Sequence, residues 1–381
     1  MANHYPSCLY WASALAFAIS LVSCSGSIAD DAVVADLGQA QCVDISEIGR
    51  EMRLVPISGD SILGAVTYAK VAGGKCFFYD EARRSIHIVE EDGTCQEFNK
   101  VGRGPEEYID LWGFSYVESE NELVIFERRT KSLRFYSLED YSESKALKMD
   151  CYLNALEHLE GSEFLLLKEG TDNLPPALVR YDTENGEGKV LMELRRDQAN
   201  MAEDYFFSRR GDDILFGVSG LNTEIYRYRD SLQKIAVVSF VPNKLGRSYW
   251  NGEFTEKKER DLMRILQDGG PGIALSPMDV SVADAGNLSF WYFVARGAVS
   301  HELPHRQCCV LRDGVATLYS QISCNDLGIK SLQPVASDGH RTYSLLAGEE
   351  ITPLSGSALG DAFLEMKNNG YNNYILSYEL Y

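Results

Sequence analysis

Strand-like apolar runs recur along this chain at a nearly regular spacing, and this repetition constrains the fold more than any other feature. The six runs are 75–80, 122–127, 163–168, 213–217, 288–294 and 341–346. The steps between them are 47, 41, 50, 75 and 53 residues, measured at Phe77, Val124, Leu165, Leu215, Phe290 and Tyr343. All but one are close to the period of a four-stranded propeller blade, ~40–50 residues. The spacing predicts an all-β fold, a six-bladed β-propeller of four-stranded antiparallel blades.

Further strands and the closure of the ring can also be predicted. Strands with polar ends follow four of the runs, at 85–89, 132–136, 177–181 and 224–228. The turns carry residues that tolerate a positive φ: Asp92-Gly93, Glu184-Asn185-Gly186 and Asp313-Gly314. Because an open sheet end exposes unpaired backbone groups, we expect a strand near 52–56 to join the last strand, 373–380, in one blade.

The long step of 75 residues holds an insertion, which we place at about 242–277. Within it, 255–267 has apolar residues at helical spacing, with Thr255 as the N-cap and Gly269-Gly270-Pro271 after the end. A second short helix is predicted at 361–367. Both helices are expected to decorate one rim of the ring.

The N-terminal segment has the pattern of an exported lipoprotein. The stretch 9–22 is apolar and uncharged, too short for a membrane span of ~20 residues but long enough for a secretion signal. Leu21-Val22-Ser23-Cys24 then resembles a bacterial lipobox, although no Lys or Arg precedes it. The predicted organisation is a signal peptide at 1–23, lipidated Cys24 with a tether to 41, and a propeller at 42–381. We expect an outer-membrane lipoprotein that faces the periplasm or the cell surface and contacts the membrane through its lipid only.

Charge and cysteine content limit the remaining classes of function. The net charge of −20 argues against binding to nucleic-acid phosphates, and we expect a soluble, monomeric ring. Of nine cysteines, Cys8 lies in the signal and Cys24 carries lipid, which leaves an odd number. Cys76 and Cys95 are predicted on strands separated by a third, ~9.5 Å apart and beyond the ~7 Å limit for a disulfide. Most cysteines are expected to be buried and reduced.

The segment Gly102-Arg-Gly-Pro-Glu-Glu-Tyr108 resembles the G-[RQ]-G-P-G-E-Y motif of six-bladed β-propeller lipoproteins of Bacteroidetes. The stretches 43–48, 52–57 and 372–380 are similar to the same family, so the resemblance covers about 43–381. This chain has Glu106 where relatives usually have glycine. The resemblance implies an exported, NHL-like propeller and implies no established reaction. Physically, the motif is predicted to form a stiff corner between two blades.

Several motifs with chemical potential have simpler explanations. His301-Glu302-Leu303-Pro304-His305 matches H-E-x-x-H, but Pro304 opposes the helix that a zinc protease needs, and flanking strands predict a hairpin. A looser zinc site of His301, His305, Cys308 and Cys309 is disfavoured, because adjacent residues on a strand face opposite ways. Paired carboxylates for glycoside hydrolysis and a Ca²⁺ ion in the channel stay open as alternatives. No catalytic residue, metal ligand or cofactor is assigned.

Aromatic residues near loops and strand ends are the better functional lead: Tyr108, Trp112, Tyr205, Phe206, Tyr249, Trp250 and Tyr292. Such rings can stack on sugars or peptide groups. Together with Arg103 in the corner motif, we select Tyr108, Trp112 and Tyr292 as candidate ligand contacts. The leading hypothesis is a non-enzymatic binding module for a glycan, a peptide or an envelope protein. The alternatives are a hydrolase or lyase acting on carbohydrate or lactone, and an envelope scaffold that uses the 242–277 insertion.

Overall fold

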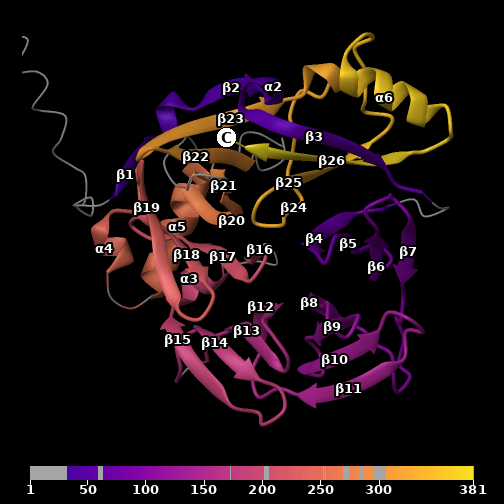
Figure 1. The fold of residues 1–381 in the computed structure, drawn as a ribbon. Coiled ribbons are helices and arrows are strands. Elements are labelled where there is room, and N and C mark those ends of the chain that lie inside the picture. Colours follow the sequence, from indigo (N-terminus) through magenta and orange to yellow (C-terminus); the bar gives the residue numbers. More distant parts are fainter. Residues whose placement is uncertain are drawn as a thin grey trace, which may run out of the picture.

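Six sheets are arranged around one central axis, as the spacing of apolar runs predicted (Figure 1). The structure is a computed structural model that describes residues 32–58, 63–171, 173–200, 206–251, 253, 255–268, 274–282, 287–294 and 306–380. Each sheet is one blade, and its strands run antiparallel from the axis outward. The predicted six-bladed β-propeller is therefore confirmed.

The first three blades are each built from four consecutive strands. Blade 1 contains β4 (Val66–Ala72), β5 (Lys75–Asp80), β6 (Ser85–Val89) and β7 (Cys95–Phe98). Blade 2 contains β8 (Leu111–Val117), β9 (Glu122–Glu127), β10 (Ser132–Ser137) and β11 (Glu143–Lys148). Blade 3 contains β12 (Leu153–His158), β13 (Glu163–Lys168), β14 (Ala177–Asp182) and β15 (Gly188–Glu193).

The other three blades also use strands from the N-terminal segment. Blade 4 contains β16 (Ser208–Arg210), β17 (Asp213–Val218), β18 (Thr223–Tyr228), β19 (Leu232–Val241) and β1 (Val33–Asp36). Blade 5 contains β20 (Ala274–Val282), β21 (Leu288–Val294), β22 (Arg306–Arg312), β23 (Val315–Ser323) and β2 (Gln41–Asp44). Blade 6 contains β24 (Ala336–Ser337), β25 (Thr342–Ala347), β26 (Asn373–Leu380) and β3 (Gly49–Pro56).

The six apolar runs are the second strands of the blades, whereas the sequence analysis took them for the innermost strands. A second strand is covered on both faces by neighbouring blades, which explains its continuous apolar sequence. In β9, Leu123 and Ile125 face the core shared with blade 1, while Val124 and Phe126 face the core shared with blade 3. The true innermost strands line the axis and carry more polar residues, so they gave a weaker signal.

The ring is closed by the predicted pairing of the two ends of the folded chain. β3 pairs antiparallel with β26, and Leu54 lies opposite Leu376 in the register. Both side chains are buried in the core between blades 5 and 6. The pairing provides the last blade with its outermost strand and removes the open edge that β26 would otherwise present.

The predicted tether is too long, because part of it is folded. β1 and β2 pair parallel with β19 and β23 and add a fifth strand to blades 4 and 5. Ala35 and Leu37 are buried against these blades. The segment is short and poor in large apolar residues, so it lacked a strand signal of its own, and tertiary pairing determines its structure.

Helices are confined to connections. They are η1 (Leu37–Gln39), α2 (Ile45–Ile48), α3 (Arg196–Asn200), α4 (Arg247–Trp250), α5 (Glu256–Asp268), η3 (Asn325–Leu327) and α6 (Ala358–Lys367). The two predicted helices correspond to α5 and α6. Since β20 begins at Ala274, the insertion spans 242–273 rather than 242–277. None of the helices in the described ranges has the length and apolar character needed to cross a membrane.

The core consists of six apolar layers, one between each pair of adjacent blades. Cys308 and Cys309 show this arrangement, since neighbouring residues on β22 enter the layers on its two sides. This confirms the argument against their sharing one metal. Cys76 and Cys95 lie on β5 and β7 with β6 between them, as predicted. The cysteines of the described chain are unpaired, and four of the seven are buried.

Candidate functional site

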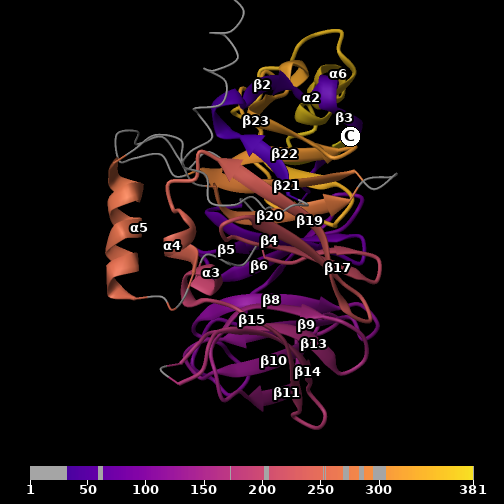
Figure 2. The same cartoon turned by 90° about the vertical axis from the view of Figure 1, so that its left-hand side faces the viewer.

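The two faces of the ring differ in the length of their connections. Connections between blades, and between the second and third strands of a blade, emerge on one side and include 99–110, 242–273 and 348–372. We call this side the long-loop face. The other side, the short-turn face, carries hairpin turns such as 73–74 and 313–314. Figure 2 shows α4 and α5 standing off one side of the ring. Long loops on a rigid scaffold are where binding residues usually lie, so the long-loop face is examined first.

The corner motif lies on this face, and its shape depends on Glu107. The Glu107 carboxylate accepts a hydrogen bond from the Gly104 amide at 2.5 Å, and the Gly102 amide donates to the Tyr108 carbonyl at 3.0 Å. A Cβ atom on Gly102 would lie 1.8 Å from a Glu107 carboxylate oxygen. Glycine at 102 therefore leaves room for the carboxylate that folds back over the corner. Arg103 is exposed at this corner and stays a candidate contact.

Tyr108 is not a ligand contact in this structure, because its side chain is completely buried. Its hydroxyl donates to the Arg84 carbonyl at 2.6 Å, and its ring stacks on Phe98. Burial raises the pKa of Tyr108. The residue fastens the corner motif to blade 1, so the predicted binding role is corrected to a packing role.

Tyr292 is corrected in the same way. It lies within β21, is buried, and packs on Phe240 with 4.7 Å between ring centroids. Its hydroxyl donates to Gln307 Oε1 at 3.1 Å. Tyr249 and Trp250, which the sequence also placed near a rim, are buried beside Arg195. Tyr205 and the H-E-x-x-H match at 301–305 lie outside the described residues, although β21 and β22 flank 301–305 as predicted.

Trp112 is the predicted aromatic contact that the structure places at the surface, with 41% of its area exposed. It lies at the start of β8, and Tyr152, 37% exposed, immediately precedes β12. Both positions open an innermost strand, so both rings lie beside the long-loop end of the channel. The two residues are one blade repeat apart in the sequence, a signal that could have identified Tyr152 from the position of Trp112.

The Arg128 guanidinium group is bracketed by these two rings. Its central carbon lies 4.1 Å from the Trp112 ring centroid and 4.9 Å from that of Tyr152. Lys131 adds a second cation, with Nζ 4.0 Å from the Tyr152 ring. Glu169 accepts a hydrogen bond from Arg128 Nη1 at 2.6 Å and fixes the guanidinium in place. We call Trp112, Arg128, Lys131, Tyr152 and Glu169 the mouth cluster.

Backbone irregularities set the position of Trp112. In β8, Leu111 pairs with Glu127 and Gly113 with Phe126, so Trp112 is an extra residue in a β-bulge. Similar register shifts leave Thr67 extra in β4 and Asn154 extra in β12. Bulges redirect side chains and are frequent next to functional sites. Three consecutive innermost strands therefore place an inserted residue at the same end of the channel, and no sequence pattern indicated this.

Deeper in the channel, three innermost strands are connected by buried charges. Glu157 on β12 accepts hydrogen bonds from Lys70 Nζ on β4 and from Arg209 Nε on β16, the latter at 3.1 Å. Lys70 Nζ also donates to the Leu156 carbonyl at 2.8 Å. Burial alone would raise the pKa of Glu157, but Lys70 and Arg209 hold the pKa below its ordinary value. We call these three side chains the channel triad, whose charges pair with one another and brace the ring.

Asp279 on β20 is a buried carboxyl with unusual backbone geometry. Its φ is +47°, and Oδ2 has no hydrogen-bond partner among the described residues. Burial raises its pKa to about 6, with Arg306 acting in the opposite direction. In the described ranges, no group of three or more His, Cys, Asp and Glu side chains is arranged to hold a metal ion.

Asp279 should make stability depend on pH. Its folded-state pKa lies above the unfolded value of ~3.9, so the folded state keeps the proton longer and loses stability as the pH rises from about 4 through 6. A shift of this size corresponds to ~3 kcal/mol above pH 6. We expect Asp279→Asn to raise Tm at pH 8 and to leave it nearly unchanged at pH 4. An equal change in Tm at both values of pH would contradict this explanation.

These features define a class before any comparison is made: a closed six-bladed propeller with an aromatic and cationic cluster at one channel mouth. The family model described as "6-bladed beta-propeller" matches residues 25–263, more than half of the chain. The chain belongs to this family, which agrees with the resemblance carried by the corner motif. No curated protein matches it.

Solved structures show the same fold at low identity. A Bacteroides fragilis protein described as exported is 14% identical, with a TM-score of 0.66 over 92% of this chain and 99% of that chain. A DUF4221 protein of Bacteroides vulgatus is 10% identical, with a TM-score of 0.49 over 88% of this chain and 98% of that chain. Streptogramin B lyase reaches 0.40 at 10% identity, over 87% of this chain and 98% of that chain, too little to argue about activity.

Proposed function

We propose that this protein is an exported, lipid-anchored binding module that holds a glycan with acidic groups at the mouth cluster. The observation that carries the proposal is the pair of half-exposed rings, Trp112 and Tyr152, on either side of Arg128. Exposed aromatic surface is suited to the apolar faces of sugar rings, and a fixed guanidinium is suited to a carboxylate or sulfate.

Local charge supports an acidic glycan in spite of the strongly negative chain. The turn between β9 and β10 contains Arg128, Arg129 and Lys131 within four residues, and Arg129 is exposed. Attraction from this turn acts at short range. Repulsion from the distant acidic surface is screened beyond ~8 Å at physiological salt. An acidic sugar can therefore be bound at this corner of a protein whose net charge is −20.

The experiment is a binding screen with the mature chain, residues 25–381, against neutral oligosaccharides, uronic-acid or sulfated oligosaccharides, and acidic peptides. Acidic oligosaccharides are expected to bind without being converted to products. Selective binding of peptides would replace the glycan with a peptide ligand. Turnover of the bound sugar would instead favour the hydrolase or lyase alternative.

Trp112→Ala is expected to weaken binding of the acidic oligosaccharide about tenfold, since an aromatic contact of ~1.4 kcal/mol corresponds to that factor. Val315→Ala is the matched control, because Val315 is an exposed apolar residue beside a turn of the short-turn face. Isothermal titration of both variants measures the effect. Equal affinities of Trp112→Ala and the wild type would remove the mouth cluster from the proposal.

The lipid anchor rests on the N-terminal pattern and on two supporting observations. The family match begins at residue 25, directly after Cys24, and a protein of the same fold is described as exported. Anchoring at the outer membrane through Cys24 follows from the lipobox. Stable attachment requires more than one acyl chain, because each buried CH₂ contributes only ~0.8 kcal/mol.

Replacing Cys24 by Ala is expected to abolish incorporation of labelled palmitate and to move the protein from the detergent phase to the aqueous phase on Triton X-114 partitioning. The wild-type chain serves as the positive control. Incorporation of palmitate that persists in Cys24→Ala would show that the lipid is attached elsewhere.

A further inference from the structure

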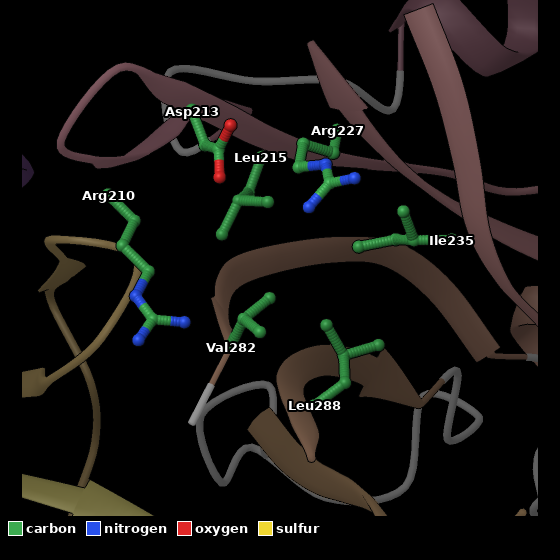
Figure 3. Close-up of a pocket in the computed structure, with 7 residues that line it drawn as sticks. All are labelled: Arg210, Asp213, Leu215, Arg227, Ile235, Val282 and Leu288. Atoms are coloured by element: carbon green, nitrogen blue, oxygen red, sulfur yellow. The ribbon is translucent and has the colours of Figure 1, made fainter. Parts of the chain in front are cut away.

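A cavity lies between blades 4 and 5 on the short-turn face, away from the mouth cluster. Its volume is about 190 Å³. It is lined by Arg210, Asp213, Leu215, Arg227, Ile235, Val282 and Leu288 (Figure 3). Arg210 and Asp213 flank the first turn of blade 4, and Val282 and Leu288 flank the first turn of blade 5. The cavity is therefore framed by rigid strand ends.

The walls of this cavity are divided into an apolar part and a cationic part. Leu215 and Leu288 belong to the buried core between the two blades, while Ile235 on β19 leaves 37% of its surface exposed at the edge. Figure 3 shows the side chains of Arg210 and Arg227 reaching toward the hollow from two sides. Two cations thus face a hollow that also presents aliphatic surface.

The acidic residue at the cavity already has a cationic partner outside it. Asp213 accepts a hydrogen bond from Arg229 Nε at 2.8 Å, and its side chain is 15% exposed. Arg227 Nη2 donates to Gln233 Oε1 at 2.7 Å, which orients its guanidinium without neutralising it. With Asp213 balanced by Arg229, Arg210 and Arg227 leave an excess of positive charge.

We infer that this cavity binds a short aliphatic carboxylate. The carboxylate accepts hydrogen bonds from the two guanidinium groups, which suit its planar geometry, and the alkyl chain lies on Leu215, Ile235 and Leu288. The volume holds on the order of six water-sized groups, since each occupies ~30 Å³ in the liquid, so the ligand is an acid of about four to six carbons. This inference is independent of the glycan proposal, because the two sites lie on opposite faces and different blades.

The test is isothermal titration of the mature chain, residues 25–381, with hexanoate, hexan-1-ol and acetate. Hexanoate should bind at least tenfold more tightly than the other two, because only hexanoate has both a carboxylate and a long chain. Arg227→Gln should weaken hexanoate binding about tenfold. Arg129→Gln, which changes an exposed arginine on the long-loop face, should leave it unchanged.

Arg227→Gln carries the decision, because the side chain is partly exposed and its loss leaves the core intact; Arg210→Gln adds a second measurement where that variant folds. The inference is overturned if hexanoate does not bind, if acetate or hexan-1-ol binds as well as hexanoate, or if Arg227→Gln has the same affinity as the wild type. Hexanoate binding that Arg129→Gln weakens as much as Arg227→Gln would likewise overturn it.

Discussion

Glu157→Gln is expected to destabilise the propeller by about 3 kcal/mol or more, because it leaves a buried ammonium group without its counter-charge. Lys70 and Glu157 expose only 7% and 6% of their side chains, so water cannot replace the lost interaction. The substitution keeps the size of the side chain and leaves an oxygen for Arg209. Charge is therefore the main property that changes.

A double variant separates the charge effect from a general effect of altering the channel. Lys70→Met with Glu157→Gln removes both buried charges of the closest pair, and replacing a whole buried pair is often nearly neutral. We expect the double variant to recover most of the stability lost in Glu157→Gln, as measured by urea denaturation. A double variant less stable than Glu157→Gln would show that the triad does not act through paired charges.

Removing β3 is expected to prevent the mature chain from folding into a soluble monomer. Without residues 49–56, β26 becomes an open edge, and the core between blades 5 and 6 loses Leu54. Exposed, hydrophobic strand edges promote aggregation, so a chain that starts at residue 58 should be insoluble or form large assemblies in size-exclusion chromatography.

Two longer chains provide the matched controls. A chain that starts at residue 32 keeps every described strand and should equal the mature form in Tm. A chain that starts at residue 45 lacks β1 and β2 but keeps the closing strand, so it should fold with a lower Tm. If the chain that starts at residue 58 is as stable as the one that starts at 45, closure by β3 is unimportant.

The parts of the fold that could be predicted are those with a strong local signal. Second strands such as β9 are covered on both faces, so their sequences are apolar throughout and recur with the blade period. Ring closure was predictable because an unpaired edge is unfavourable in any sheet. β1 could not be predicted, since its four residues acquire strand structure only by pairing with β19, about 200 positions later in the chain.

The candidate site was predicted only in part, for a physical reason. Tyr108 and Trp112 both occur in or beside a loop, yet one is buried and the other is half exposed. The difference arises from a bulge in β8 and from packing between blades, and neither feature leaves a mark in the local sequence. Arg128 was noted only as part of an isolated basic pair, and its position between two rings depends on contacts between blades 2 and 3.

Hydrogen exchange of the mature chain with and without a bound acidic oligosaccharide tests the central claim most directly. Ligand bound at the mouth cluster should slow exchange in the segments 110–113, 128–131 and 150–154, and the short-turn face should be unaffected. Protection confined to the turns of the short-turn face, or spread evenly around the ring, would contradict a glycan site beside Trp112 and Tyr152.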